Sequence, residues 1–168
     1  MSLLNTVIKF FVGDKQQKDL KQLQPVVTNT NTYTPEISKL SNDALRAKTS
    51  EFKYKIKEAT NNFNEQINVL EKEAITASID RQEEIYTEID ALKNQAYTVS
   101  ENILTDIMPE AFAVIKETAK RFTENTEIKV TATSFDIELS SVNNHISLDG
   151  DIAVWQNSWD AAGKPVTW

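Results

Sequence analysis

Two long series of hydrophobic residues follow helical spacing through the middle of the chain. Most steps within each series are three or four residues, the spacing that places side chains on one face of a helix. The pattern predicts two arms, about 42–74 and 80–107, that pack as an antiparallel hairpin and turn within 74–80. The alternative is one helix of about 60 residues, whose apolar stripe would need a second chain to cover it. The two series are Leu45, Phe52, Ile56, Ala59, Phe63, Ile67, Leu70 and Ala74, and then Ile85, Ile89, Leu92, Ala96, Val99, Ile103 and Ile107.

The N-terminal part of the chain predicts short helices that are separated by glycine and proline. An apolar segment over 2–12 ends at Gly13, and a second helix over 15–24 ends at Pro25. Proline removes a helical hydrogen bond and clashes with the preceding turn, so it is expected at or beyond a helix end. Residues 28–34 have the composition of a loop, with residual helix as the alternative.

Two capping signals precede the first long arm. Thr34 followed by Pro35 predicts the N-terminus of a short helix that reaches Leu40, because proline is favoured at the first helical position. Ser41 is then the expected N-cap of the long arm, since a serine hydroxyl can accept from a free backbone N–H.

The hydrophobic period changes towards the C-terminus. Pro109 predicts the start of a further helix over 109–122, with a wide apolar side that must be buried. Beyond Asn125 the residues alternate in the manner of strands. The predicted strands are 127–133, 145–148, 152–155 and 166–168, with Asp149-Gly150-Asp151 as a hairpin turn.

Together these elements predict an α+β fold that is mainly α. It consists of N-terminal helices, a long antiparallel helical hairpin and a small C-terminal antiparallel sheet. We divide the chain into the N-terminal helices (1–60), the hairpin (61–107), one further helix (108–122) and the sheet (123–168). The chain stops at Trp168 within a strand pattern, and we interpret it as a piece of a longer protein.

Composition and charge remove several classes of function. The absence of cysteine excludes disulfides, thiolate catalysis and cysteine-based metal centres, and the single histidine, His145, excludes a His-rich metal site. The net charge of −7 argues against nucleic acid as a partner, because phosphate binding needs clustered cations. No apolar run reaches the roughly 20 residues of a spanning helix, and the N-terminus lacks the features of a signal peptide. We therefore expect a soluble, acidic protein of the cytoplasm.

No motif predicts a catalytic, nucleotide-binding or metal-binding residue. The three glycines, Gly13, Gly150 and Gly163, are isolated, so the chain has no Walker A loop for phosphate. Glu84 and Glu88 share a helix face, but a solvated surface explains them better than metal ligation.

Two other features are also better explained by structure than by chemistry. Asp149 and Asp151 lack the remaining ligand spacing of a calcium loop and fit a turn. His145 has no serine nucleophile in a suitable context. No enzyme active site is therefore expected in this chain.

Three tryptophans are the best internal candidates for a binding surface. Trp155, Trp159 and Trp168 could form a platform for a protein partner, although packing of a small sheet explains them more simply. A stand-alone helical-hairpin adaptor that binds a protein through this sheet is therefore one hypothesis for function.

Two blocks of sequence resemble SecA, the motor ATPase family of bacterial preprotein translocation. The first runs from Lys9-Phe-Phe-Val-Gly-Asp-Lys through Asp19-Leu-Lys-Gln-Leu-Gln-Pro to Leu45-Arg-Ala-Lys-Thr-Ser-Glu-Phe52, and is similar to the family's start and its "LRAKTxEF" stretch. The second, Met108-Pro-Glu-Ala-Phe-Ala-Val-Ile-Lys-Glu-Thr-Ala-Lys-Arg121, is similar to the family's "LPEAFAVVREAAKR" helix. Together the blocks cover somewhat under half of the chain.

The chain departs from the usual family pattern in two places. About 55 residues separate the two blocks, where most members have a short link. Residues 122–168 follow the second block, where the family passes almost directly to its glutamine motif and Walker A loop. Both segments look like insertions into the N-terminal region of the motor, and an inserted hairpin would leave and return to nearly the same point.

The resemblance implies a parent protein that uses ATP and Mg²⁺ to push preproteins through the SecYEG channel. This chain lacks the nucleotide motifs, so it is expected to bind no cofactor itself and to act as a non-catalytic scaffold. By resemblance its partners are SecYEG, preproteins and an anionic membrane surface. A homodimer that forms through exposed residues of the two hydrophobic series is a further expectation. The parent would be cytoplasmic and peripherally associated with the inner membrane.

The N-terminal segment is the expected contact with membrane and translocon. In the family the first helix contributes to such contacts, and here an apolar face lies beside lysines on an otherwise acidic chain. The alternative is a helix that docks on its own domain. The candidate contact residues are Leu4, Ile8, Lys9, Phe11, Lys15 and Lys18.

Overall fold

The computed structural model describes residues 3–167, and it describes side chains for Lys15 and for 17–167. The fold is α+β and mainly α, as expected. Its elements in chain order are α1 (Leu3–Ile37), α2 (Asn42–Ala74), α3 (Ile79–Glu124), β1 (Glu127–Thr131), α4 (Ser134–Ser140), β2 (Ile146–Asp149), β3 (Ile152–Gln156), β4 (Ser158–Ala161) and β5 (Lys164–Thr167).

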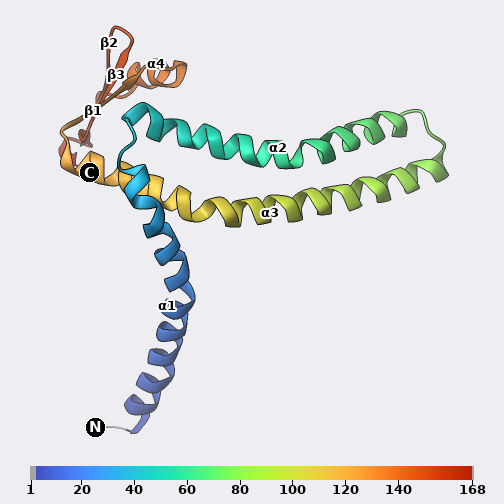
Figure 1. The fold of residues 1–168 in the computed structure, drawn as a ribbon, viewed down its shortest axis with the longest axis horizontal. Helices are drawn as coiled ribbons and strands as arrows, with labels where there is room; N and C mark the ends of the chain where they lie inside the picture. Colours follow the sequence, from blue (N-terminus) through green and yellow to red (C-terminus); the bar gives the residue numbers. More distant parts are fainter. Residues whose placement is uncertain (1–2, 168) are drawn as a thin grey trace.

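The molecule is elongated, with its parts arranged around one end of a helical hairpin. Helices α2 and α3 lie side by side along the long axis and turn at residues 75–78 (Figure 1). Helix α1 leaves the opposite end and extends away from both, while α4 and the strands gather at that same end. We call the end that carries α1 and the strands the base, and the turn at 75–78 the tip.

The hairpin and its turn confirm the prediction from hydrophobic spacing. Every residue of the two predicted series is buried or half-buried, and α2 and α3 meet along these faces. Ser41 caps α2 as expected, since the Ala44 N–H donates to its Oγ at 3.1 Å. The sequence spacing therefore located both arms, although α3 extends beyond the predicted second arm.

Two hydrophobic clusters hold the hairpin, one near each end. The base core consists of Ile37, Leu45, Ala113 and Val114, and the tip core consists of Ile67, Ala74, Ile85 and Ile89. Between the clusters the facing residues are only half-buried, because two helices alone cover each other from one side.

Helix α1 contradicts the prediction of separate N-terminal helices. It runs through Gly13, Pro25 and the expected loop at 28–34, and it ends only at Ile37 with Pro35 in its last turns. Tertiary packing overrides the loop-like composition only in the C-terminal part of the helix, since the side chains of residues 17–25 are exposed. The C-terminal part of α1 contacts α3, and Ile37 is 3% exposed in the base core.

Threonine hydroxyls support this continuous helix. Thr28 Oγ1 donates to the Gln24 carbonyl and Thr30 Oγ1 to the Val26 carbonyl, each at 2.9 Å and four residues back. These side chains therefore bond within the helix and do not support an alternative loop.

Helix α3 also contradicts the predicted break at Pro109. The helix continues through this proline to Glu124, so the expected separate helix over 109–122 is the C-terminal part of α3. Pro109 is buried, and the residues after it, Ala113 and Val114, pack into the base core. Burial of the proline and of the turn after it offsets the one helical hydrogen bond that it removes.

A three-stranded antiparallel sheet has the order β1-β3-β2, with Ala153 and Val154 buried on the central strand. Glu127 pairs with Gln156, and Ile146 pairs with Trp155. The turn between β2 and β3 is at 150–151, where Gly150 has a φ of +58°. Glycine suits this left-handed backbone because it has no Cβ, which agrees with the predicted turn.

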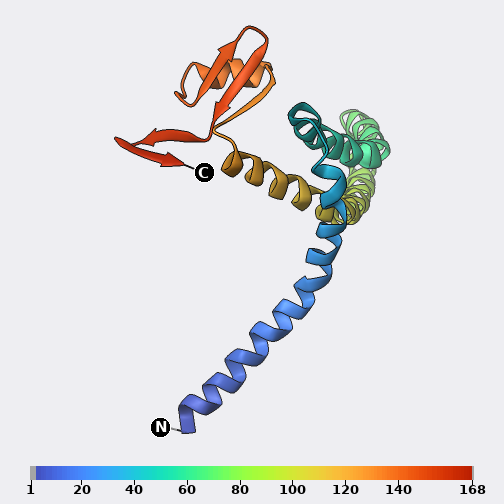
Figure 2. The ribbon, with the colours of Figure 1, turned by 60° about the vertical axis from the view of Figure 1, so that its left-hand side comes forward.

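The end of the chain forms a second, two-stranded sheet. Strands β4 and β5 pair antiparallel, with Trp159 opposite Val166, and they extend away from the other strands (Figure 2). The predicted strand at 166–168 thus begins earlier, at Lys164, and its last residue, Trp168, lies outside the described residues.

Candidate functional site

The first turn of α2 binds the edge strand of the three-stranded sheet. Asp43 accepts twice from Thr131, from its backbone N–H at 2.8 Å and from its hydroxyl at 2.9 Å. Asn42 Nδ2 donates to the Lys129 carbonyl at 3.1 Å. These bonds join residues almost ninety positions apart in sequence and fix the sheet to the base of the hairpin.

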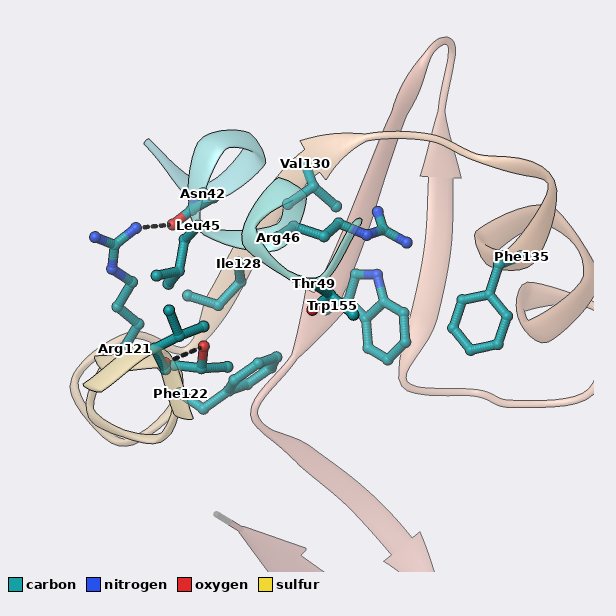
Figure 3. Close-up of a pocket in the computed structure, with 12 residues that line it drawn as sticks. Asn42, Leu45, Arg46, Thr49, Arg121, Phe122, Ile128, Val130, Phe135 and Trp155 are labelled. Atoms are coloured by element: carbon teal, nitrogen blue, oxygen red, sulfur yellow. Dashed lines mark hydrogen bonds between the residues drawn. The ribbon is translucent and has the colours of Figure 1, made fainter. Parts of the chain in front are cut away.

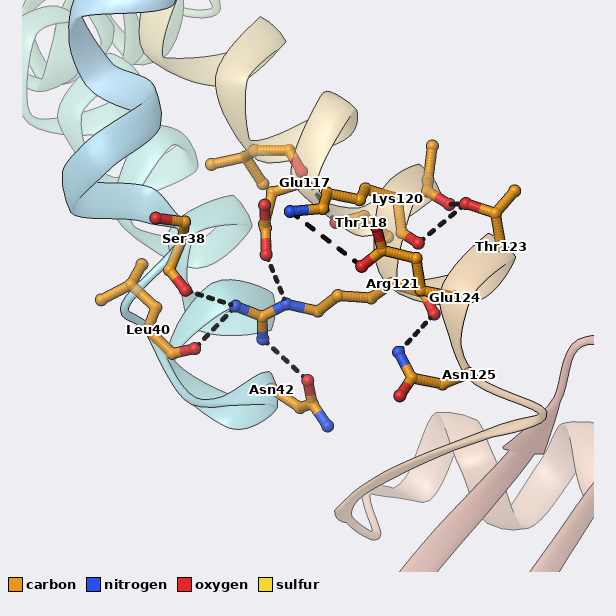
Figure 4. A network of polar contacts seen from close by, with 12 residues as sticks. Ser38, Leu40, Asn42, Glu117, Thr118, Lys120, Arg121, Thr123, Glu124 and Asn125 are labelled. Carbon is orange, nitrogen blue, oxygen red and sulfur yellow. Dashed lines mark hydrogen bonds and ion pairs between the residues drawn. The ribbon is translucent and has the colours of Figure 1, made fainter.

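Arg121 joins the end of α3 to the turn between α1 and α2 (Figure 4). Its Nε donates to Glu117 at 2.8 Å, and its Nη1 donates to Asn42 Oδ1 at 2.8 Å. Its Nη2 donates to the carbonyls of Leu40, at 2.8 Å, and Ser38, at 3.4 Å. Because the guanidinium presents donors in a fixed plane, one side chain satisfies several acceptors of this turn.

A buried carboxylate, Asp136, connects α2, α4 and β3. It is fully buried and pairs with Arg46, whose Nη1 lies 2.8 Å from Asp136 Oδ2. Trp155 Nε1 donates to its other oxygen at 3.0 Å. The Thr133 N–H and hydroxyl donate to Oδ2 at 2.8 and 2.7 Å, which completes a capping box at the start of α4.

These partners hold the pKa of the Asp136 carboxyl well below its usual range. Burial alone would raise this pKa, because it disfavours the charged form. The hydrogen bonds from Arg46, Thr133 and Trp155 outweigh that effect, because each favours the carboxylate. Asp136 is therefore ionised throughout the physiological pH range.

An apolar pocket of about 280 Å³ lies between these two networks (Figure 3). We call it the junction pocket, because α2, α3, α4 and the three-stranded sheet all contribute to its walls. Phe135 and Trp155 lie towards one end and Arg121 and Phe122 towards the other. The remaining lining residues are Asn42, Leu45, Arg46, Thr49, Val114, Thr118, Ile128 and Val130.

The lining of the junction pocket suits apolar packing and not catalysis. Among the described residues that line it, none carries a carboxylate, and both arginines already bond to acceptors elsewhere. The Thr118 hydroxyl donates to the Val114 carbonyl within its own helix. The pocket can therefore accept an apolar side chain, and its walls supply no base or nucleophile.

Apolar side chains are also exposed on the two helices α3 and α4. Phe112 and Ile115 on α3 are 48% and 62% exposed, and Phe135 and Ile137 on α4 are each 55% exposed. The wide apolar side predicted for 109–122 is thus only half covered, since Ala113 and Val114 are buried while their neighbours are not.

The predicted membrane-contact residues all lie in α1. Lys15 and Lys18 are exposed on the part of α1 beyond the base core. The side chains of Leu4, Ile8, Lys9 and Phe11 lie outside the described residues.

The structure brings two of the three candidate tryptophans to the same histidine. The rings of Trp155 and Trp159 lie 6.3 and 6.1 Å from the ring of His145, which also explains that histidine as a packing residue. Trp155 additionally bonds to Asp136, so it serves the internal network.

Sequence reasoning missed the residues that organise the base: Arg46, Arg121 and Asp136. Only Asp136 had a local signal, because Thr133 and Asp136 have the spacing of a capping box. The two arginines bond mainly to residues about 80 to 90 positions away, and no local pattern encodes such partners.

Two further properties concern the described part of the chain. Among the described side chains, those of Lys15 and 17–167, no group of His, Asp and Glu could hold a metal ion. No helix in the same part is long and apolar enough to cross a membrane.

Comparison with known proteins identifies the family. Residues 8–137 match the family described as SecA DEAD-like domain. A "Protein translocase subunit SecA" from Christiangramia forsetii is 55% identical over 169 aligned residues, which cover 100% of this chain and 15% of that protein. Proteins with the same name from Flavobacterium psychrophilum and Bacteroides fragilis are 53% and 36% identical, covering 100% and 98% of this chain and again 15% of the relative. No solved structure matches.

The alignments with these relatives extend through both segments that depart from the usual family pattern, the hairpin and the C-terminal strands. The chain spans about 15% of the length of these relatives. The resemblance found in the two sequence blocks is thereby confirmed over the whole chain. This chain belongs to the SecA family.

Proposed function

We propose that this chain is the N-terminal, non-catalytic segment of a protein translocase subunit. The parent protein would couple ATP hydrolysis, with Mg²⁺, to the export of preproteins through SecYEG at the cytoplasmic face of the inner membrane. The observation that carries this proposal is the 55% identity to a translocase subunit along the entire chain. No observation favours a stand-alone adaptor.

The base of the hairpin is the scaffold for the rest of the parent. The junction pocket is apolar, and apolar side chains are also exposed on α3, at Phe112 and Ile115, and on α4, at Phe135 and Ile137. Exposed apolar surface of this kind is normally covered by another part of a protein when it is contiguous. The remaining domains of the parent are the proposed cover.

The test of the function is a translocation assay with the full-length protein that carries this chain. Membrane vesicles containing SecYEG are incubated with a preprotein, and protection of the preprotein from added protease is measured. We expect protection with ATP and none with a non-hydrolysable ATP analogue. Equal protection in both reactions, or none in either, would contradict the proposal. The 168-residue chain alone should show no saturable binding of a fluorescent ATP analogue.

We propose α1 as the contact with the membrane. Leu20, Leu23 and Val27 follow helical spacing and are 66%, 58% and 51% exposed, beside exposed Lys15 and Lys21. Apolar side chains flanked by lysines suit an anionic lipid surface.

Vesicle flotation tests this contact. The double variant Leu20→Ser/Leu23→Ser, and deletion of residues 1–13, should each reduce the preference for phosphatidylglycerol over phosphatidylcholine vesicles. The matched control is Ile75→Ser/Ile79→Ser, which removes two even more exposed apolar side chains at the tip. If the control reduced binding as much, α1 would not be the contact. Homodimer formation stays a prediction, to be tested by light scattering.

A further inference from the structure

The distal half of the hairpin carries almost all of the net charge of the chain. Residues 65–90 contain eight acidic and two basic side chains, a net charge of −6, while the whole chain has a net charge of −7. This half lies at the end of the hairpin that is remote from α1 and from the strands (Figure 1). The negative potential is therefore concentrated on one projecting part of the molecule.

The basic side chain of Arg81 is already shared among three carboxylates. It lies 3.0 Å from Glu73 and 3.1 Å from both Glu84 and Glu88. The hydrogen bonds that Arg81 donates to Glu84, Glu88 and Glu73 raise the pKa of its guanidinium, so it stays charged. One cation among three anions leaves this side of the hairpin negative.

A groove of about 560 Å³ runs between α2 and α3 in this acidic half. We call it the hairpin groove. Leu70 and Leu92 form its apolar floor, where they pack on the tip core, and Val69 stands beside them with 65% of its surface exposed. Glu65 and Glu88 lie on its rim. An apolar floor between carboxylates can hold an apolar side chain and pair with cations on either side of it.

We propose that the hairpin groove binds a short cationic protein segment, in which an apolar side chain is flanked by lysine or arginine. Charge complementarity selects this occupant. Anionic lipid and nucleic acid are both repelled by the net charge of −6 over 65–90. The inference is independent of the proposed translocase function, because it rests on the hairpin alone.

The probe for this site is a labelled amphipathic peptide with lysines on both sides of a leucine stripe. Binding to the full chain is measured by fluorescence anisotropy. We expect saturable binding that weakens with added salt, and no binding of the same peptide with glutamate in place of lysine.

Two variants locate the site, and a matched variant controls for it. Val69→Asp and Glu65→Lys should each weaken binding by about tenfold, through lost apolar contact and through charge reversal. Both residues are exposed, so the helices should stay intact, which circular dichroism checks. Val142→Asp makes the same substitution at a valine that is 74% exposed and lies outside the hairpin, and it should leave binding unchanged.

Three results would overturn the inference. The first is the absence of saturable binding, and the second is equal weakening by Val142→Asp and Val69→Asp. The third is binding of phosphatidylglycerol vesicles that Val69→Asp abolishes, which would assign the groove to a membrane. The result of the translocation assay does not depend on these outcomes. The proposed translocase function and the proposed peptide site can therefore be refuted independently.

Discussion

The base and the tip of the hairpin are held together by different kinds of interaction. At the base, a small hydrophobic core is combined with buried ion pairs and with hydrogen bonds between residues far apart in sequence. At the tip, the core of Ile67, Ala74, Ile85 and Ile89 lies beneath an exposed, acidic surface. The base thus has directional contacts between residues about 80 to 90 positions apart, while the polar contacts that Arg81 and Gln82 make at the tip join residues at most eight positions apart.

This difference has a consequence for how each region can be used. Hydrogen bonds that Arg46 and Arg121 donate, and that Asp43 accepts, fix the sheet and the α1–α2 turn in one orientation, as a scaffold requires. At the tip, α2 and α3 pack through the apolar residues on their facing sides, so the residues on their outer surfaces are not constrained by this packing. The tip can therefore present charge and apolar side chains without disturbing the base.

The largest effect on stability is expected when apolar burial is removed at the tip, and it should be confined to that region. Ile85 is 0% exposed, so Ile85→Ala should lower the free energy of unfolding by about 3 kcal/mol through lost burial and a cavity. Hydrogen exchange should accelerate over residues 67–92 and stay unchanged around Arg121, because the regions have separate cores.

The matched control for this variant is Ile79→Ala on the same helix. Ile79 is 84% exposed, and its substitution should change the free energy of unfolding by no more than about 0.5 kcal/mol. Faster exchange at both ends in Ile85→Ala would show that the hairpin unfolds as one unit, and the comparison of two regions would fail.

A second, smaller effect on stability is expected when a buried charge is removed from the base. Asp136→Asn should cost about 2 kcal/mol at pH 7, because Arg46 and the Trp155 N–H lose a charged acceptor in a buried position. The folded-state pKa of Asp136 is depressed, so its contribution is present above the unfolded-state pKa of about 3.9 and is lost as pH falls below it.

The measurement is urea unfolding of the native protein and of Asp136→Asn at pH 7 and at pH 3. The difference between the two proteins should shrink at pH 3. The uncharged substitution Ile79→Ala, at an exposed position near the tip, should show no such difference at either pH. A constant difference between native protein and Asp136→Asn would mean that the carboxylate charge does not stabilise the base.

The same contrast explains how much could be predicted from the sequence. The hairpin depends on periodic apolar burial, and the spacing of residues such as Ile67 and Ile85 predicted both arms. The base depends on pairs such as Arg121 with Asn42, 79 residues apart, which no local pattern encodes. Continuity of α3 through Pro109 was missed for a related reason, since packing on the base core outweighs a local breaker, whereas the exposed surroundings of Pro25 offer no such explanation for α1.

The smallest expected effect compares the two N-caps of the hairpin helices. Ser41 at the base accepts a hydrogen bond from the Ala44 N–H, whereas Ser78 at the tip occupies the N-cap of α3 without a side-chain capping bond. Ser41→Ala should therefore cost about 1 kcal/mol in urea unfolding, the usual value for a lost cap. Ser78→Ala should cost less than about 0.5 kcal/mol, because no capping bond is removed. Equal costs for Ser41→Ala and Ser78→Ala would show that capping bonds stabilise the tip as much as the base. Hydrophobic burial could then not account for the difference between the two ends of the hairpin.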